Sequence, residues 1–315
     1  MKKLKIVIPG GRGQVGQLLA RHLGADGHEI IALTRHPRPG TTDIGWDGKS
    51  LGDWRRSFEG ADVIINLAGR SVNCRYDEAN LKAIMDSRVD STWVVGEAIA
   101  NCQNPPVLWL QASTATIYAH RFDAANDEAT GILGGDEPGA PPKWNASIKV
   151  AKSWEKALWG AKTPHTRKVA LRSAMTMSVD KGGIFDVMAT LARRGLGGTA
   201  GNGRQYVSWI HEEDFVNAVR FLIEREDLDG PVNLCSPNPL PNEEFFRILR
   251  HAFGAKIGLP ASALMLEIGA IFMKTETELL LKSRRVVPGR LLDAEFRFRH
   301  PDWREAVREL VQRWH

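Results

Sequence analysis

The most informative feature of this 315-residue sequence is a set of glycines close to its N-terminus. An apolar run, residues 4–8, ends at Pro9, and Gly10, Gly13 and Gly16 follow it at the start of a helical pattern. Glycines at this spacing allow a tight turn, close approach of the backbone to a pyrophosphate, and close packing of a helix on a strand. The free N–H groups at the start of such a helix favour a bound anion. The pattern therefore predicts a dinucleotide-binding loop.

The rest of the chain alternates short apolar runs with longer segments of helical periodicity. The apolar runs are continuous, which is typical of strands buried on both faces of a parallel sheet. We predict strands near residues 4–8, 30–33, 62–67, 107–111, 169–172 and 231–234, and helices near 78–102, 144–159, 212–224, 242–253, 261–282 and 302–314. This order predicts an α/β protein with a Rossmann-type doubly wound parallel sheet and a smaller, mostly helical C-terminal substrate lobe.

The length and the glycine distribution predict how the chain is divided. At roughly 150 residues per domain, this length fits one large domain with a smaller lobe. The regular alternation loosens after about residue 178, where glycines become frequent. We therefore assign residues 1–178 and 206–236 to the nucleotide-binding domain, and residues 179–205 and 237–315 to the C-terminal lobe.

Composition excludes several classes of protein. Hydrophobic residues make up 43% and charged residues 25%, and a net charge of +5 is spread along the chain, which argues against disorder and against a nucleic-acid partner. Cys74, Cys102 and Cys235 form no CxxC or zinc pattern, so we expect reduced thiols, no metal and a cytoplasmic location. The longest apolar stretch, residues 259–273, contains Glu267 and is too short to span a membrane.

The second predicted strand indicates which dinucleotide is bound. It ends at Thr34 and Arg35, without the carboxylate that usually holds the ribose hydroxyls of NAD. Arg35 follows the strand where a 2′-phosphate would lie, and Arg12 is part of the glycine loop. Guanidinium groups suit phosphate geometry. The sequence therefore predicts that NADP(H) is preferred over NAD(H).

Two further strands end in residues suited to a ligand. Small residues after residues 62–66 let the backbone pass close to a cofactor, and residues 113–118 place hydroxyls at the end of the fourth predicted strand. In an open α/β sheet, ligands bind at these carboxyl ends. The complete set of predicted cofactor-binding residues is Gly10, Gly11, Arg12, Gly13, Gln14, Val15, Gly16, Thr34, Arg35, Asn66, Leu67, Ala68, Gly69 and Ser113.

In this order, the motifs resemble the extended short-chain dehydrogenase/reductase superfamily. More closely, the chain is similar to an atypical epimerase-like family of NAD-dependent epimerases and dehydratases that carries a small C-terminal domain of unknown function. Matching stretches run nearly end to end and include Arg75-Tyr76, where the family usually has Arg-Trp, and residues 201–205, 208–211 and 285–288. The resemblance implies an NADP-binding domain, a small-molecule substrate, and a homodimer formed through the helices near 78–102 and 144–159.

The catalytic pair of the superfamily is missing from this chain. Typical members use a Ser or Thr together with a Tyr that is followed four residues later by a Lys, and no Tyr here has a Lys at that position. Alignment of the helix on Glu155 places the Tyr position at Ser147 and the Lys position at Ala151. Thr114 aligns with the Ser/Thr position and is one catalytic candidate. Tyr118, four residues later, is the second candidate, as a proton donor.

These features leave more than one function open. The residues proposed for substrate binding are Arg75, Arg204, Gln205 and His211. The first hypothesis is an NADP(H)-dependent oxidoreductase or epimerase-like enzyme that acts on a small polar molecule, either free or nucleotide-linked. The alternative is a non-catalytic NADP(H)-binding module that senses redox state, since the catalytic pair is absent. A third reading is a structural or membrane-surface role for the C-terminal helix.

Overall fold

A seven-stranded parallel sheet forms the centre of the protein. The computed structural model describes residues 2–135, 137, 140–255, 257–260 and 276–314. The strand order is β10-β6-β5-β4-β1-β2-β3. The strands are β1 (Lys5–Pro9), β2 (Glu29–Thr34), β3 (Ile44–Gly45), β4 (Val63–Asn66), β5 (Leu108–Thr114), β6 (Arg167–Ser173) and β10 (Gly230–Leu234). The predicted Rossmann-type doubly wound sheet is confirmed.

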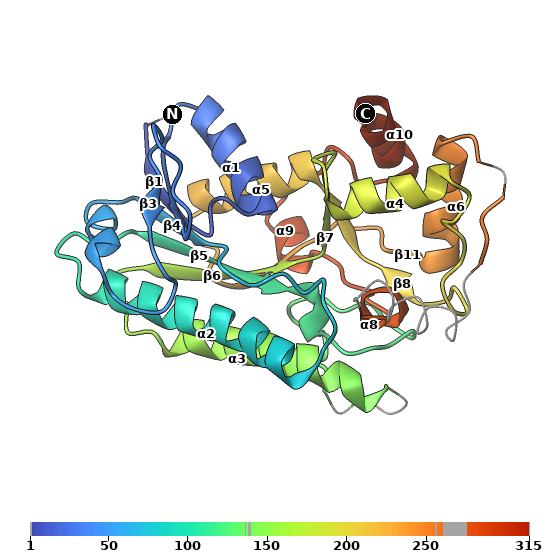
Figure 1. Ribbon diagram of the computed structural model, residues 1–315, viewed down its shortest axis with the longest axis horizontal. Coiled ribbons are helices and arrows are strands. Elements are labelled where there is room, and N and C mark those ends of the chain that lie inside the picture. Colours follow the sequence, from blue (N-terminus) through green and yellow to red (C-terminus); the bar gives the residue numbers. More distant parts are fainter. Residues whose placement is uncertain (1, 136, 138–139, 256, 261–275, 315) are drawn as a thin grey trace.

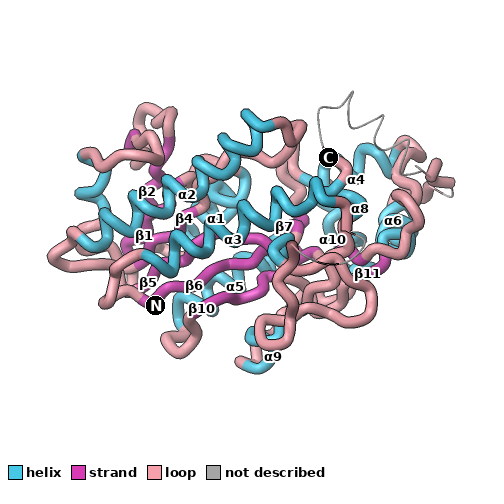
Figure 2. Tube along the Cα trace, turned by 90° about the horizontal axis from the view of Figure 1, so that it is seen from below, coloured by secondary structure: helices cyan, strands magenta, loops and turns pink. Residues whose placement is uncertain are grey.

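Helices cover both faces of this sheet (Figure 1). α1 (Gln14–Ala25) and α5 (Glu212–Glu224) lie on one face, and α2 (Glu78–Ala100) and α3 (Asn145–Gly160) lie side by side on the other (Figure 2). Strand β1 shows why the apolar runs are continuous: Ile6 and Ile8 belong to the core under α1 and α5, whereas Val7 belongs to the core under α2. Because successive side chains of this strand enter the cores on opposite faces of the sheet, residues 6–9 are all buried and these positions favour apolar residues.

Three helices build most of the smaller lobe. α4 (Ile184–Arg193), α6 (Asn242–Ala252) and α10 (Trp303–Arg313) share a core that contains Phe185, Phe245 and Trp303. Two small sheets join this lobe to the main sheet. One pairs β7 (Met175–Met177) with β9 (Trp209–His211), and the other pairs β8 (Tyr206–Val207) with β11 (Leu240–Pro241). The smaller lobe is mostly helical, as predicted.

The C-terminal segment also returns to the main sheet. α9 (Gly289–Asp293) places Leu291 in the core under α1 and α5, and Phe296 joins it there. The division of the chain at residue 237 stays a prediction. Of the helix predicted near 261–282, the structure describes only its last part, which contains α8 (Glu278–Leu281), and most of the apolar stretch 259–273 lies outside the described residues. In the described ranges, no helix is long and apolar enough to cross a membrane.

Candidate functional site

The glycine loop has the backbone geometry that its spacing predicts. Gly10 has a φ of +78°, and its N–H donates a hydrogen bond of 2.9 Å to the carbonyl of Leu33 at the end of β2. A Cβ on Gly10 would lie 2.8 Å from the backbone nitrogen of Ala68, and a Cβ on Gly16 would lie 2.7 Å from Gly11. The loop therefore fits tightly between two strand ends only because these positions carry no side chain.

Helix α1 begins with unsatisfied backbone N–H groups that face this loop. Its N-cap residue is Gly13, so no side chain caps the first turn. Gln14 is exposed and its amide packs against Gly183 at the start of α4, whereas Val15 is half-buried against the main core. Free N–H groups at a helix start, together with the helix dipole, form an anion site. The loop thus fits a pyrophosphate.

The turn after β4 is held in place by a buried amide pair. The Asn66 side chain donates to the side-chain oxygen of Gln111 at 3.0 Å, and it accepts a hydrogen bond of 3.1 Å from the N–H of Ala68. Leu67 and Ala68 lie against Gly10, and Gly69 lies against the guanidinium of Arg88, where an added Cβ would be 3.2 Å from Cζ. This turn therefore links the glycine loop to residues on α2.

The two arginines predicted to contact a 2′-phosphate have different surroundings. Arg35 is exposed beside Thr34 at the end of β2. Arg12 donates to both carboxylate oxygens of Asp43, which lies just before β3. The Asp43 carboxylate has no exposed surface, while 27% of the Arg12 side chain remains exposed. Sequence reasoning did not identify Asp43, because its partner is 31 residues away.

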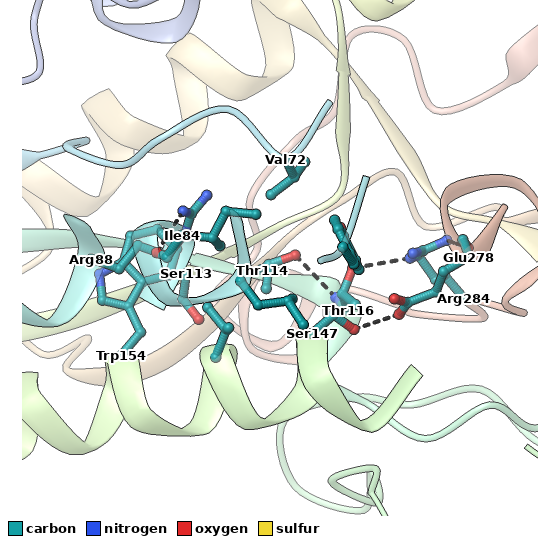
Figure 3. Close-up of a pocket in the computed structure, with 13 residues that line it drawn as sticks. Val72, Ile84, Arg88, Ser113, Thr114, Thr116, Ser147, Trp154, Glu278 and Arg284 are labelled. Carbon is teal, nitrogen blue, oxygen red and sulfur yellow. Dashed lines mark hydrogen bonds between the residues drawn. The ribbon is translucent and has the colours of Figure 1, made fainter. Parts of the chain in front are cut away.

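A cavity of about 260 Å³ opens beyond the carboxyl end of β5 (Figure 3). Its polar lining comes from four separate segments of the chain. These residues are Tyr76, Arg88, Ser113, Thr114, Thr116, Ser147, Glu278 and Arg284. The remaining lining is apolar and belongs mainly to α2 and α3. The cavity thus combines hydroxyl groups with charged groups next to the turn that follows β4.

Thr114 is a lining hydroxyl that can contact a ligand. It is the N-cap of a short helical turn, Ala115–Ile117, and its Oγ1 accepts a hydrogen bond of 3.1 Å from the N–H of Thr116. Within the described ranges, its hydroxyl proton has no acceptor on the protein. Ser113, by contrast, donates its proton to the buried carboxylate of Glu155 at 2.7 Å. Thr114 can therefore donate a hydrogen bond into the cavity.

The two positions where the superfamily carries Tyr and Lys differ in their surroundings. Ser147 lines the cavity, and its hydroxyl contacts the carbonyl of Trp144 and the carboxylate of Glu278. Ala151 is fully buried in a small apolar cluster. The position that would carry the tyrosine therefore faces the cavity but holds a short hydroxyl, and the position that would carry the lysine holds a methyl group.

A tyrosine that sequence reasoning did not select lines the same cavity. Tyr76 lies in the loop before α2, and its N–H donates to the carboxylate of Glu276 at 2.8 Å. Burial and the negative charge of Glu278 raise the pKa of the Tyr76 phenol above its ordinary value. The phenol therefore keeps its proton at neutral pH. The signal in the sequence was the Tyr in the Arg75-Tyr76 pair, where the family usually has Trp.

Tyr118 lies in a buried network behind the cavity. Its hydroxyl donates to Asn233 at 2.9 Å and accepts from Arg172 at 2.9 Å. Arg172 also donates twice to Glu155, at 2.8 Å each, which completes the network. Burial raises the pKa of the Tyr118 phenol, although Arg172 acts in the opposite direction. Tyr118 does not line the cavity, and its hydrogen-bonding groups are used within the fold.

The four predicted substrate-binding residues do not converge on the cavity. Arg75 pairs with Glu276, with 3.3 Å between Nε and Oε1. Arg204 is exposed after a glycine turn, and the amide of Gln205 donates to the carbonyls of Ala200 and Leu280. These residues therefore lie in different parts of the structure and do not form one substrate site.

His211 belongs to the start of α5. Its Nδ1 accepts from the N–H of Glu213 at 3.2 Å, and its Nε2 lies 2.9 Å from the carboxylate of Glu309. Burial and the neighbouring His300 lower the pKa of His211. A neutral ring that accepts at Nδ1 and donates at Nε2 satisfies both contacts, so its observed role is a helix cap.

The comparisons with known proteins match two parts of the chain. The sequence profile of the NAD dependent epimerase/dehydratase family matches residues 6–235. The chain belongs to this family. Residues 261–310 match a second profile, a domain of unknown function (DUF1731). The resemblance inferred from the motifs is thereby confirmed over most of the sequence, and the family is one of nicotinamide-dinucleotide enzymes.

Relatives of this family match the chain from end to end. The epimerase family protein SDR39U1 of Homo sapiens is 28% identical over 313 residues, which cover 98% of this chain and all of the relative. The crystal structure of human SDR39U1 with NADPH has a TM-score of 0.85 at 27% identity, covering 98% of this chain and 99% of that one. The nucleoside-diphosphate sugar epimerase from Corynebacterium glutamicum has a TM-score of 0.78 at 27% identity, covering this whole chain and 59% of that one.

Proposed function

We propose that the protein is an NADP(H)-dependent oxidoreductase or epimerase-like enzyme that acts on a small polar molecule. The observation that carries this proposal is the cavity at the carboxyl end of β5, joined to the glycine loop through Gly69 and Arg88. In open α/β sheets, a dinucleotide and its substrate meet at this edge. The unused hydroxyl proton of Thr114 supplies a hydrogen-bond donor at that point.

The chain has a residue for each part of the cofactor. The N–H groups at the start of α1 would hold the pyrophosphate, and the turn held by Asn66 would pass beside the nicotinamide half. Arg35 would contact the 2′-phosphate, with Arg12 kept beside it by Asp43. The human relative crystallised with NADPH supports the phosphorylated dinucleotide. When bound, the nicotinamide would supply or accept a hydride.

Two cavity residues would assist at the substrate oxygen. Thr114 would donate a hydrogen bond to it, which stabilises negative charge that develops there. We assign proton donation to Tyr76, because its phenol lines the cavity and the charge of Arg284 acts to lower its pKa, against burial and Glu278. Tyr118, with its hydroxyl bound to Asn233 and Arg172, would act on the fold instead.

Transfer of an isotopic label tests the enzyme directly. Purified protein is incubated with NADPH that carries deuterium at C4, together with aldehydes, ketones, oxo acids and nucleoside-diphosphate sugars. We expect deuterium in one reduced product, detected by mass spectrometry. Thr114→Val should lower that transfer by about a hundredfold, and Thr114→Ser should retain most of it. Equal transfer by all three proteins would remove Thr114 from the proposal.

One observation favours the second function, a redox-sensing module without catalysis. Ala151 occupies the position of the usual lysine and is fully buried, so this position of α3 provides no cation to lower the pKa of a tyrosine. A module of this kind would bind NADPH and NADP with different affinities and would transfer no deuterium to any compound of the panel. Label transfer would exclude it.

The implied homodimer and cytoplasmic location are also part of the proposal. α2 and α3 lie side by side on one face, and Trp93 and Trp159 there are 49% and 40% exposed. Large exposed apolar side chains favour an interface. Light scattering after size exclusion should give twice the chain mass, and Trp93→Glu should return the protein to a monomer. A monomeric wild type would contradict the dimer.

A further inference from the structure

We propose that the cavity binds a small oxo acid or hydroxy acid, and that Arg88 receives its carboxylate. This inference rests on the proposed function, because it names the substrate class for the same cavity. The family resemblance leaves both free and nucleotide-linked substrates open, and this proposal favours free small acids.

Arg88 is a largely buried cation, and the part of the chain that the structure describes places no carboxylate beside it. Its guanidinium lies 5.0 Å from the centre of the Trp154 ring, and one terminal nitrogen donates to the carbonyls of Arg70 and Ile84. No carboxylate of the described residues lies within salt-bridge distance of it. Burial lowers the pKa of Arg88 to about 10, so it remains charged at neutral pH. A buried charge is costly unless an opposite charge meets it.

The other charged groups of the cavity have partners of opposite sign. Arg284 has the carboxylate of Glu278 as its charge neighbour, and its Nε donates to the hydroxyl of Thr116 at 3.0 Å. Lys282, behind them, does not line the cavity, and it has Glu137 as a charge neighbour in addition to Glu278, 3.9 Å away. The uncompensated positive charge of the lining therefore belongs to Arg88, and it favours a ligand with a negative group at that end.

The positions of these groups suggest how such a ligand would lie. Figure 3 shows Arg88 at one end of the cavity and the Glu278–Arg284 pair at the other, with Thr114 between them. A carboxylate on Arg88 would place the adjoining oxo or hydroxyl oxygen toward Thr114. The side walls are apolar, from Val72, Ile84 and neighbouring residues, so the body of the ligand would be short and carbon-rich.

Size and charge argue against a nucleotide-linked ligand in this cavity. Its volume of about 260 Å³ is smaller than the roughly 300–1,000 Å³ of pockets that enclose drug-sized molecules. A diphosphate would also need several cations. Arg204, predicted for that role, is exposed outside the cavity lining, and the Gln205 amide is bound to backbone carbonyls. A small mono-anion fits both the volume and the single uncompensated charge.

The test uses calorimetry on the protein with and without NADP. The probes are pyruvate, 2-oxobutyrate and 2-oxohexanoate, their uncharged amides, and UDP. We expect at least one acid to bind about tenfold or more tightly than its amide, and UDP not to displace it. Arg88→Met should abolish that preference, because it keeps the apolar stem against Trp154 and removes the charge. Arg88→Lys should retain part of it.

Arg70→Met is the matched control, because the Arg70 side chain is exposed and its carbonyl remains available to Arg88. It should keep the preference for the acid, and melting curves should show all variants folded. Equal binding of acid and amide, no binding by any acid, or displacement by UDP would overturn the inference. Dinucleotide binding is measured separately. The proposed function can therefore fail while carboxylate binding is observed, and carboxylate binding can fail while the dinucleotide still binds.

Discussion

The guanidinium of Arg12, in the glycine loop, is held by the carboxylate of Asp43, which directly precedes β3. Burial acts to raise the pKa of Asp43, but hydrogen bonds from Arg12 and from the N–H of Arg38 outweigh it and lower that pKa. The pair is close to neutral as a whole. Arg35, exposed at the end of β2, is therefore the cation that we expect to attract a 2′-phosphate.

Substitution of Arg35 should change which dinucleotide is bound. We expect Arg35→Ala to weaken NADPH binding by about tenfold or more and to leave NADH binding nearly unchanged, since only NADPH carries the extra phosphate. Affinities from fluorescence titration give the ratio. Arg38→Ala, on the adjacent exposed loop, is the control. An unchanged NADPH/NADH ratio in Arg35→Ala would show that this residue does not contact the phosphate.

Arg12→Ala should affect the fold as well as the cofactor. It leaves the covered Asp43 carboxylate without its ion partner, and we expect a loss of about 1 kcal/mol in the free energy of unfolding at neutral pH. Because the pairing lowers the pKa of Asp43 in the folded protein, that stabilisation is present above the unfolded pKa and disappears as pH falls. Urea unfolding at neutral pH and at about pH 2, below the lowered pKa of Asp43, measures it. A loss of equal size at both would contradict the ion pair.

Tyr76→Phe tests the proton donor proposed for the cavity. The change removes one hydroxyl from the lining, so we expect catalytic turnover to fall by about a hundredfold or more while NADPH binding is unchanged. Tyr206→Phe is the matched control, since Tyr206 packs under Arg285 and does not line the cavity. If Tyr76→Phe and Tyr206→Phe turned over alike, the proton would have another source.

A buried lysine near the cavity predicts how stability depends on pH. Burial, together with the nearby charge of Arg284, lowers the pKa of Lys282 to about 8. Between about pH 8 and about pH 10, the unfolded chain keeps a proton that the folded protein has lost, so stability rises with pH. Unfolding free energies should show a rise of up to about 2 kcal/mol relative to Lys282→Met. Parallel curves for the two proteins would argue against this shift.

The sequence predicts the sheet well, because a strand that is buried on both faces appears in the sequence as a continuous apolar run. The run at residues 4–8 becomes β1 (Lys5–Pro9), and the helix predicted at 212–224 is α5 with the same bounds. α4 was not predicted, since it begins directly after two glycines in a segment that breaks the regular alternation. Its core contacts come from α6 and α10, which are far away in the sequence.

The site could be predicted only where its residues are neighbours in the sequence. The glycine loop and Thr114 belong to single strand ends, and periodicity was enough to find them. Tyr76, Arg88 and Glu278 reach the cavity from separate segments, and only folding brings them together. For the same reason, the sequence did not reveal Asp43 as the partner of Arg12. Tyr118 was selected because it follows Thr114 closely in the sequence, and in the structure Thr114 and Thr116 line the cavity whereas Tyr118 does not.

Cofactor binding by the wild-type protein is the most direct test of the central claim. The protein, freed of any bound dinucleotide, is titrated with NADPH and separately with NADH, following tryptophan fluorescence and energy transfer to the reduced nicotinamide. We predict saturable binding of NADPH, about tenfold or more tighter than that of NADH. No saturable binding of either dinucleotide would show that the loop of residues 10–16 serves the fold alone.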